Sequence, residues 1–190
     1  AIEWLEDVDL IESPAETAEL ARSVDGTDGV YVVPAFTGLG APHWDGRARG
    51  TIVGMTRGTR REHIVRATLE AIAYQTRDVA EAMEADAGVE MGTLKVDGGA
   101  VKNNFLCQLQ SDIIGTEIVR PEVDETTALG AAYAAGLAVG YWDSLAELRD
   151  NWHVDAEFAP QMNSSDADAR FERWHDAVER SKDWAQEGGD

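Results

Sequence analysis

The chain has 190 residues, 44% of them hydrophobic, and a formal net charge of −20 from 36 acidic and 16 basic residues. This length and hydrophobic content allow a domain with a sizeable core and exclude a wholly disordered chain. The acidic excess argues against nucleic acid or an anionic membrane as a partner. No apolar run approaches the roughly 18 residues of a membrane span, so none is predicted.

The acidic residues are spread over the whole chain, whereas the basic residues are nearly all arginines. Lysine occurs only as Lys95, Lys102 and Lys182. A solvated acidic surface is the simplest interpretation. Abundant acid with scarce lysine also resembles proteins from salt-loving organisms. Since salt screens repulsion between surface charges, this halophilic hypothesis predicts a melting temperature that rises with salt.

The first residues, Ala1–Glu6, are acidic and already follow a helical pattern, unlike a secretory signal peptide. The chain starts without Met, and we expect it to be an excerpt of a longer protein whose N-terminal part is missing. Cys107 is the only cysteine, which excludes an internal disulfide. We interpret it as a small buried apolar residue in a cytoplasmic protein.

The first third of the chain predicts short helices within residues 1–21, with a capping box at Ser13–Glu16. An apolar β-branched run at 30–34 predicts a buried strand, and 51–55 predicts a second one. The loop at 35–50 is rich in glycine and aromatic residues. It is either a structured crossing that lines a cleft or a surface excursion held by Trp44.

A second capping box, Thr59–Glu62, predicts the start of a long amphipathic helix that ends near Ala87 at Gly88. A strand at 94–96 leads into a glycine turn, and a helix at 104–114 follows, ended by Gly115. The run 117–120 predicts another short strand.

Thr126 or Thr127 is predicted to cap a helix of small residues at 128–136. Such a helix packs its backbone close to a neighbour or a ligand, and we favour the neighbour. Ser144 is predicted to cap a short helix, and an amphipathic helix is expected at 166–185. Strands separated by helices indicate an α/β layer structure.

The glycine turn Gly98–Gly99 lies between a strand and a helix. This arrangement points backbone N–H groups and a helix N-terminus at an anion or a nucleotide. Glycine lets a ligand approach the main chain, although an ordinary turn is the alternative. Asp97 precedes the glycines, where it either serves catalysis or orients the turn. We favour the second role.

The histidines are scattered and lack a metal-ligand spacing, so no metal site is predicted. His63 in particular is expected at the surface, in the first turn of the long helix. The sequence has no P-loop, no G-x-S-x-G elbow and no G-x-G-x-x-G motif. No catalytic residue is assigned in this chain. The histidines are His43, His63, His153 and His175.

Four stretches in this order and spacing resemble the C-terminal half of the FGGY carbohydrate kinases. They are Gly29–Asp45, Gly50–Glu70, Val96–Leu106 and Glu125–Gly140. The resemblance covers nearly the whole chain. It implies the second domain, residues 1–190, of a two-domain kinase. The fold implied is that of a ribonuclease-H-like or actin-like ATPase domain, a central β-sheet flanked by helices.

The resemblance also implies a nucleotide site for ATP or ADP. Gly98, Gly99 and Asn103 match the adenosine motif of the family. Glu3 matches a polar position on the first helix, where relatives usually carry Gln. A carboxylate there would accept a hydrogen bond from the adenine amino group but could not donate one.

The catalytic Asp and most Mg²⁺ contacts of the family fall in the missing N-terminal domain, which is the expected partner. Within the resemblance, the stretch Phe36–Asp45 favours glycerol as the phosphate acceptor. We therefore expect the fragment alone to be inactive and to bind ATP weakly or undetectably. A homo-oligomer is compatible with the resemblance. A sugar-transport regulatory protein is not predicted as a partner, because Gln161–Asp166 does not match its motif.

Three alternatives stay open at this point. One is a kinase of the same family for a xylulose- or gluconate-type substrate. Another is an actin-fold module that senses nucleotide or acts like a chaperone, without kinase activity. The signature at Gly50–Glu70 argues against it. The third is an interaction domain with a degenerate site, against which Gly98, Gly99 and Asn103 weigh.

Overall fold

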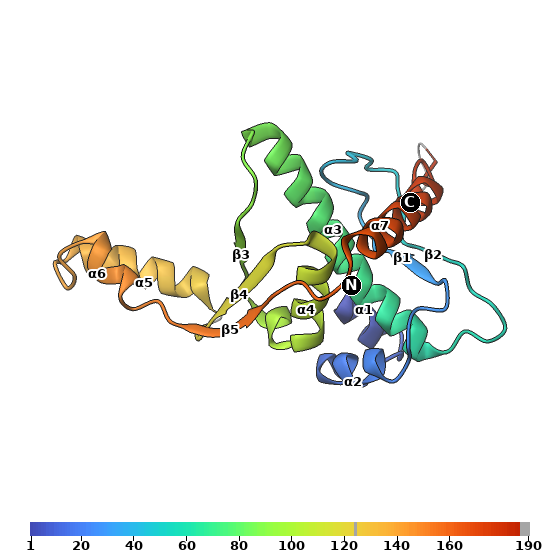
Figure 1. Ribbon diagram of the computed structural model, residues 1–190, viewed down its shortest axis with the longest axis horizontal. Coiled ribbons are helices and arrows are strands. Elements are labelled where there is room, and N and C mark those ends of the chain that lie inside the picture. The colour runs from blue at the N-terminus through green and yellow to red at the C-terminus, as the bar shows by residue number, and fades with distance from the viewer. Residues whose placement is uncertain (124, 187–190) are drawn as a thin grey trace.

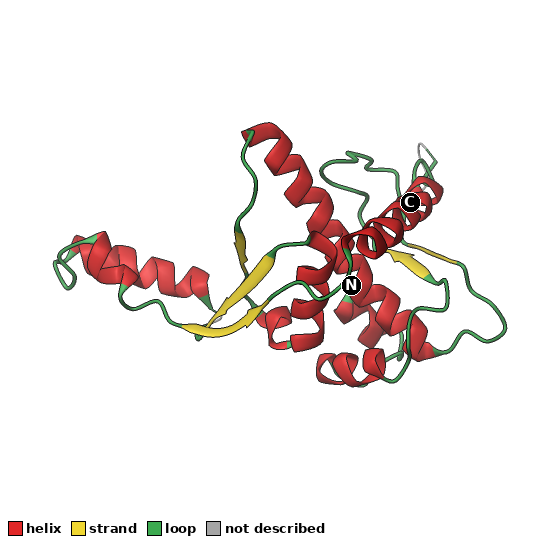
Figure 2. Ribbon diagram, viewed as in Figure 1, coloured by secondary structure: helices red, strands yellow, loops and turns green. Residues whose placement is uncertain are grey.

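The computed structural model describes residues 1–123 and 125–186. Helices gather in a body that contains both ends of the described chain, and an arm built from β4, β5, α5 and α6 extends to one side (Figures 1 and 2). The strands form a two-stranded and a three-stranded sheet. The predicted α/β class is confirmed, with the strands divided between two sheets in this chain.

The N-terminal segment forms two short α-helices and a 3-10 turn. They are α1 (Ile2–Asp7), η1 (Pro14–Glu16) and α2 (Thr17–Arg22). The predicted capping box is present, with Ser13 as the N-cap and Pro14 at the first helical position. The capping box and the proline both restrict the local backbone and need no tertiary contact to do so.

Strand β1 (Tyr31–Val33) pairs antiparallel with β2 (Thr51–Val53), as predicted for two strands in this region. The loop between them is not held by Trp44, whose side chain is 79% exposed. A backbone ladder holds it instead, in which Leu39 N donates to Asp45 O over 2.7 Å. The Asp45 carboxylate also accepts from the backbone N of Ala48 at 3.1 Å.

Helix α3 (Arg61–Ala87) is the longest element and begins one residue later than the predicted cap implies. Arg60 is the N-cap, and its backbone N donates to His63 Nδ1 over 3.0 Å. The hydroxyl of Thr59 serves the preceding turn, where it accepts from Thr56 N at 2.8 Å. Gly88 ends the helix at φ 65°, in the left-handed region that favours glycine.

The second sheet has the order β3-β4-β5, parallel and then antiparallel. Helix α4 crosses from β3 to β4, as predicted, and ends at Gly115. Cys107 on the helix packs in one buried cluster with Val101 of the preceding turn and Ile118 of β4. The elements are β3 (Thr93–Lys95), η2 (Gly99–Lys102), α4 (Asn104–Ile114), β4 (Glu117–Pro121) and β5 (Val154–Phe158).

The arm carries α5 (Thr126–Ala138) and α6 (Leu145–Arg149). Neither threonine caps α5: Glu125 is its N-cap, without a side-chain cap bond. The predicted close packing of α5 is seen at Gly136, where an added Cβ would lie 2.2 Å from the Trp142 ring, but none of the helix residues is buried within this chain. Ser144 does cap α6, accepting from Glu147 N at 3.3 Å.

Helix α7 (Ser164–Ser181) closes the body over β1, α3 and α4. Trp174 is fully buried in the largest core cluster, and its Nε1 donates to Val32 O over 3.0 Å. Tyr74 and Phe171 pack around the indole. Among the described helices, none is long and apolar enough to cross a membrane.

Candidate functional site

The glycine turn joins β3 to α4 at the edge of the body. Gly98 has φ 84° and ψ 175°, a combination that is essentially restricted to glycine. The chain then makes the 3-10 turn η2 (Gly99–Lys102) before α4 begins. Gly98 is thus required by the backbone conformation itself.

Gly99 differs from its neighbour, because its backbone conformation does not demand glycine. A Cβ built at this position would meet no atom within 4 Å. Gly99 also lines a pocket, so the open space at its α-carbon belongs to that pocket. A missing side chain at such a place allows a ligand to approach the main chain closely.

Asn103 is the N-cap of α4 and anchors the turn to the rest of the body. Its Oδ1 accepts from Leu106 N at 3.1 Å. Its Nδ2 donates to Thr17 Oγ1 over 3.1 Å, and that hydroxyl donates to Pro14 O over 2.7 Å. Asn103 therefore fixes the distance between α2 and the glycine turn, the two walls of the pocket.

The pocket itself has a volume of about 450 Å³ and opens between the N-terminal helices and the glycine turn. This size is in the range of small-molecule sites. The lining is mostly apolar, with a few polar groups. Its residues are Ile2, Pro14, Ala15, Thr17, Ala18, Arg22, Gly99, Ala100, Lys102, Asn103 and Asn104.

Charge distinguishes this pocket from the rest of the surface. Arg22 and Lys102 line it, and no carboxylate is among the described residues that do so. This contrasts with the net charge of −20 on the whole chain. The first residue of α4, Asn104, also lies in the wall, which places the positive end of that helix dipole at the pocket. The site can thus accommodate an anionic ligand with a flat apolar part.

The four residues predicted for the nucleotide are placed differently by the structure. Gly99 and Asn103 come together in the wall of the pocket. Gly98 shapes the turn and Glu3 is exposed on α1, and neither is among the lining residues. Residue Ile2, beside Glu3, does line the pocket.

Sequence reasoning missed Arg22, Lys102 and Thr17 as parts of this wall. The turn motif marks only one side of the pocket, and α2 reaches the other side through a tertiary contact. Thr17 is only 1% exposed, an unusual burial for a polar residue that its bond to Asn103 explains.

Asp97 lines a different pocket, of about 330 Å³, between the second sheet and α5. Lys95 and Tyr133 line the same space. Lys95 Nζ lies 3.8 Å from the ring centroid of Trp152, within the range of a cation–π contact. Asp97 and Gly99 therefore face separate spaces, and Asp97 is not part of the wall around Gly99.

Buried polar groups support the body beneath the site. Glu70 is 3% exposed and accepts from Arg66 Nε at 3.1 Å and from the Tyr74 hydroxyl at 3.0 Å. Burial and the nearby Glu70 charge raise the pKa of Tyr74 far above its usual value. Burial likewise raises the pKa of Cys107, whose Sγ donates to Val101 O over 3.2 Å. Cys107 is fully buried, as predicted.

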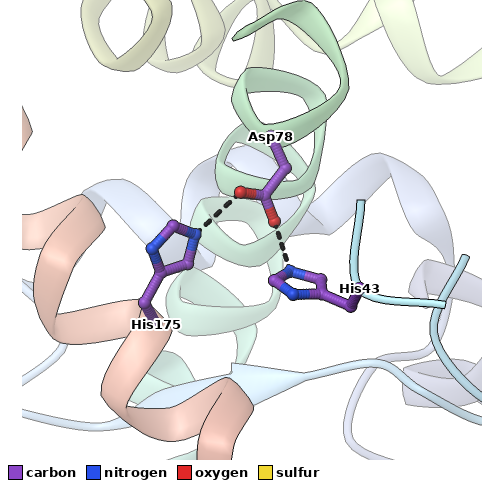
Figure 3. A group of neighbouring side chains, drawn as sticks. All are labelled: His43, Asp78 and His175. Carbon is purple, nitrogen blue, oxygen red and sulfur yellow. Dashed lines mark hydrogen bonds and ion pairs between the residues drawn. The ribbon is translucent and has the colours of Figure 1, made fainter. Parts of the chain in front are cut away.

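The histidines are not as scattered in space as in sequence. His43 and His175 both contact the carboxylate of Asp78, which is 5% exposed (Figure 3). No spacing along the chain indicates this group, because its members come from a loop and from two helices. His63 is half-buried and makes the helix cap described above.

A scan against protein-family models matches residues 2–139 to the C-terminal domain of the FGGY family of carbohydrate kinases. A glycerol kinase from Haloarcula marismortui is 80% identical over 98% of this chain, and one from Thermoanaerobacter pseudethanolicus is 58% identical over 98%. The chain spans 37% of the length of the first and 38% of the second. Haloarchaeal relatives fit the salt-adapted composition.

Solved structures of the same family share the fold. A crystal structure of Plasmodium falciparum glycerol kinase with ADP superposes with a TM-score of 0.86 at 42% identity, covering 95% of this chain and 36% of that chain. A ligand-bound xylulose kinase from Lactobacillus acidophilus gives a TM-score of 0.76 at 25% identity, covering 94% of this chain and 36% of that chain.

Proposed function

The chain belongs to the FGGY family of carbohydrate kinases, and on this premise we propose that it is the nucleotide-binding half of an ATP-dependent glycerol kinase. The pocket at Gly99 and Asn103 carries the proposal. Its apolar lining suits a nucleoside, and Arg22 with Lys102 suits the attached phosphates. The similar Plasmodium falciparum glycerol kinase was crystallised with ADP, which supports the same ligand class.

In this proposal each residue of the motif has a separate task. Gly98 sets the backbone turn, and Gly99 lets the nucleotide approach the main chain. Asn103 holds α2 and α4 at a fixed spacing, so the pocket is formed before the ligand binds. Glu3 lies on α1 beside the lining residue Ile2, and we assign it at most a contact at the edge of the site.

The reaction is the transfer of the terminal phosphoryl group of ATP to a hydroxyl group of glycerol. Such transfer depends mainly on positioning and on neutralising charge. The chain's own residues would hold the end of ATP that does not react. No described carboxylate lines the pocket, so its residues do not fit a Mg²⁺ site. We assign the metal and the catalytic base to the rest of the full-length protein.

The exposed arm supports this division. Helix α5 is apolar on all sides and buries none of its residues within this chain. A helix of that kind is normally covered in a folded protein. The relatives are much longer than this chain, so we propose that the remainder of the full-length protein covers α5. The 190 residues then act as one unit of a larger enzyme.

The proposal predicts that the full-length protein phosphorylates glycerol in a coupled assay. Xylulose and gluconate are the comparison substrates, because kinases for both share the fold at 25% identity. Preference for xylulose or gluconate would show that glycerol is the wrong substrate, while the proposal for the nucleotide site would still stand. Lack of activity toward all three, combined with unimpaired ADP binding, would instead favour a module without kinase activity.

The isolated chain provides the second arm of the test. We expect it to show no glycerol phosphorylation and only weak ATP binding, since it supplies one wall of the site. Measurable turnover by the purified chain, or micromolar ATP affinity by calorimetry, would contradict this division of labour.

A further inference from the structure

A second convergent group of side chains lies apart from the glycine turn. The Nε2 atom of His43 is 2.7 Å from Asp78 Oδ2, and the Nε2 atom of His175 is 2.7 Å from Asp78 Oδ1 (Figure 3). His43 comes from the loop at 35–50, Asp78 from the middle of α3, and His175 from α7. None of the three lines the pocket at Gly99.

We propose that His43, Asp78 and His175 form a binding site for a divalent transition metal of the Zn²⁺ type. Imidazole nitrogen and carboxylate oxygen are ligands that Zn²⁺ prefers, and three protein ligands leave one position for water. In the apo protein both imidazoles donate to the carboxylate. The metal replaces those two hydrogen bonds, so each ring must give up its Nε2 proton and carry its remaining proton on Nδ1.

The distances fit this exchange with small movements. The three ligand atoms all lie within 4.8 Å of one another. A tetrahedral ion with bonds near 2.1 Å holds its ligands about 3.4 Å apart. The two carboxylate contacts must lengthen slightly, and the two imidazoles must move closer to each other.

Two of the three ligands are buried in the interior, and the third is partly exposed to solvent. The Asp78 side chain is 6% exposed and that of His43 is 14% exposed, so both are held by the interior. The His175 side chain is 40% exposed, which leaves it room to adjust and gives the ion a path from solvent. A carboxylate desolvated in this way gains from a cation beside it.

Aromatic rings pack against the two imidazoles, and the nearby Arg77 pairs with other residues than Asp78. The His43 ring meets Trp174 edge-on at 6.3 Å, and His175 packs on Phe171 with centroids 4.3 Å apart. Arg77 is the next residue to Asp78 on α3. Its guanidinium lies over Phe171 at 4.4 Å and pairs with Asp168 at 2.6 Å, so its charge is engaged there.

A metal at this site would cross-link the loop at 35–50 to α3 and α7. The test uses the full-length protein, stripped with a chelator and titrated with Zn²⁺ or Co²⁺ in high salt to screen the acidic surface. We expect one ion per chain and a visible absorption band with Co²⁺. The melting temperature should rise by about 2 to 3 °C at a hundredfold excess over Kd.

Two variants separate the site from nonspecific binding. His175→Gln, on the solvent side, should lose both the Co²⁺ band and the shift in melting temperature while the protein stays folded. His153→Gln, at an exposed histidine outside the cluster, should keep both. The proposal fails if His175→Gln binds metal like the wild type. It also fails if Zn²⁺ shifts the wild-type melting temperature no more than Mg²⁺ does.

Discussion

Helices α7 and α5 show how differently the body and the arm are built. Helix α7 has one buried face, on which Phe171, Trp174 and Val178 are at most 5% exposed. Helix α5 consists almost wholly of small and apolar residues, yet buries none of them. Apolar content therefore does not decide which helix is buried within this chain. The body provides its own covering surface, whereas α5 is left uncovered by the described residues of this chain.

The largest effect on the free energy of unfolding is expected at Trp174, in the core of the body. Replacing it by Ala removes a fully buried indole and its hydrogen bond to Val32 O. We expect a loss of about 3–5 kcal/mol in the free energy of unfolding. The matched change is Trp142→Ala in the arm, where the indole packs on Tyr133 and Tyr141. Urea unfolding followed by circular dichroism should show a much smaller loss for Trp142→Ala than for Trp174→Ala. Equal losses would contradict the difference drawn between the arm and the body.

A pH titration tests the same core. The pKa of Tyr74 is raised in the folded protein by burial and by Glu70, so the folded state retains the phenolic proton more tightly. This stabilisation is complete below about pH 10, the unfolded value, and is lost as the pH rises beyond it. Tyr74→Phe should therefore reduce the fall in stability at alkaline pH. Tyr133→Phe in the arm should leave that fall unchanged in urea melts at each pH.

A surface change should have the smallest effect on the chain by itself. Ala131 is exposed on α5, so Ala131→Arg should alter the stability of the isolated chain by less than about 0.5 kcal/mol. In the full-length protein the same arginine would be buried, and the melting temperature should fall. Ala169→Arg, on the exposed face of α7, is the control and should be neutral in both. Equal behaviour of the two variants in the full-length protein would show that α5 is not covered there.

Sequence predicted best where a local rule sets the backbone. Gly88 and Gly115 end their helices in the left-handed conformation, and Ser13 caps its turn, because each needs only its nearest neighbours. The cap at Thr59 was wrong by one residue, since the hydroxyl serves the preceding turn. Of the two alternatives for the loop at 35–50, an anchor at Trp44 is excluded, because that side chain is exposed and backbone bonds hold the loop.

Sites that combine residues far apart in the chain could not be predicted from the sequence. The wall opposite the glycine turn comes from α2, joined through the bond between Asn103 and Thr17. The cluster at Asp78 joins a loop to two helices. The exposure of α5 depends on which segments pack against it, and its own sequence does not say that the described body leaves it uncovered. Motif spacing marked Gly99 and Asn103, and the rest of the pocket required the fold.

The proposed nucleotide site at Gly99 is tested most directly by adding a single methyl group there. Gly99→Ala should leave the fold intact, because a Cβ at this position meets nothing within 4 Å, and the same holds for the control Gly92→Ala. In the full-length protein we predict that Gly99→Ala raises the KM for ATP about tenfold, a loss near 1.4 kcal/mol. The KM for glycerol should stay unchanged, and Gly92→Ala should match the wild type. An unchanged KM for ATP in the Gly99→Ala protein would contradict the proposed site.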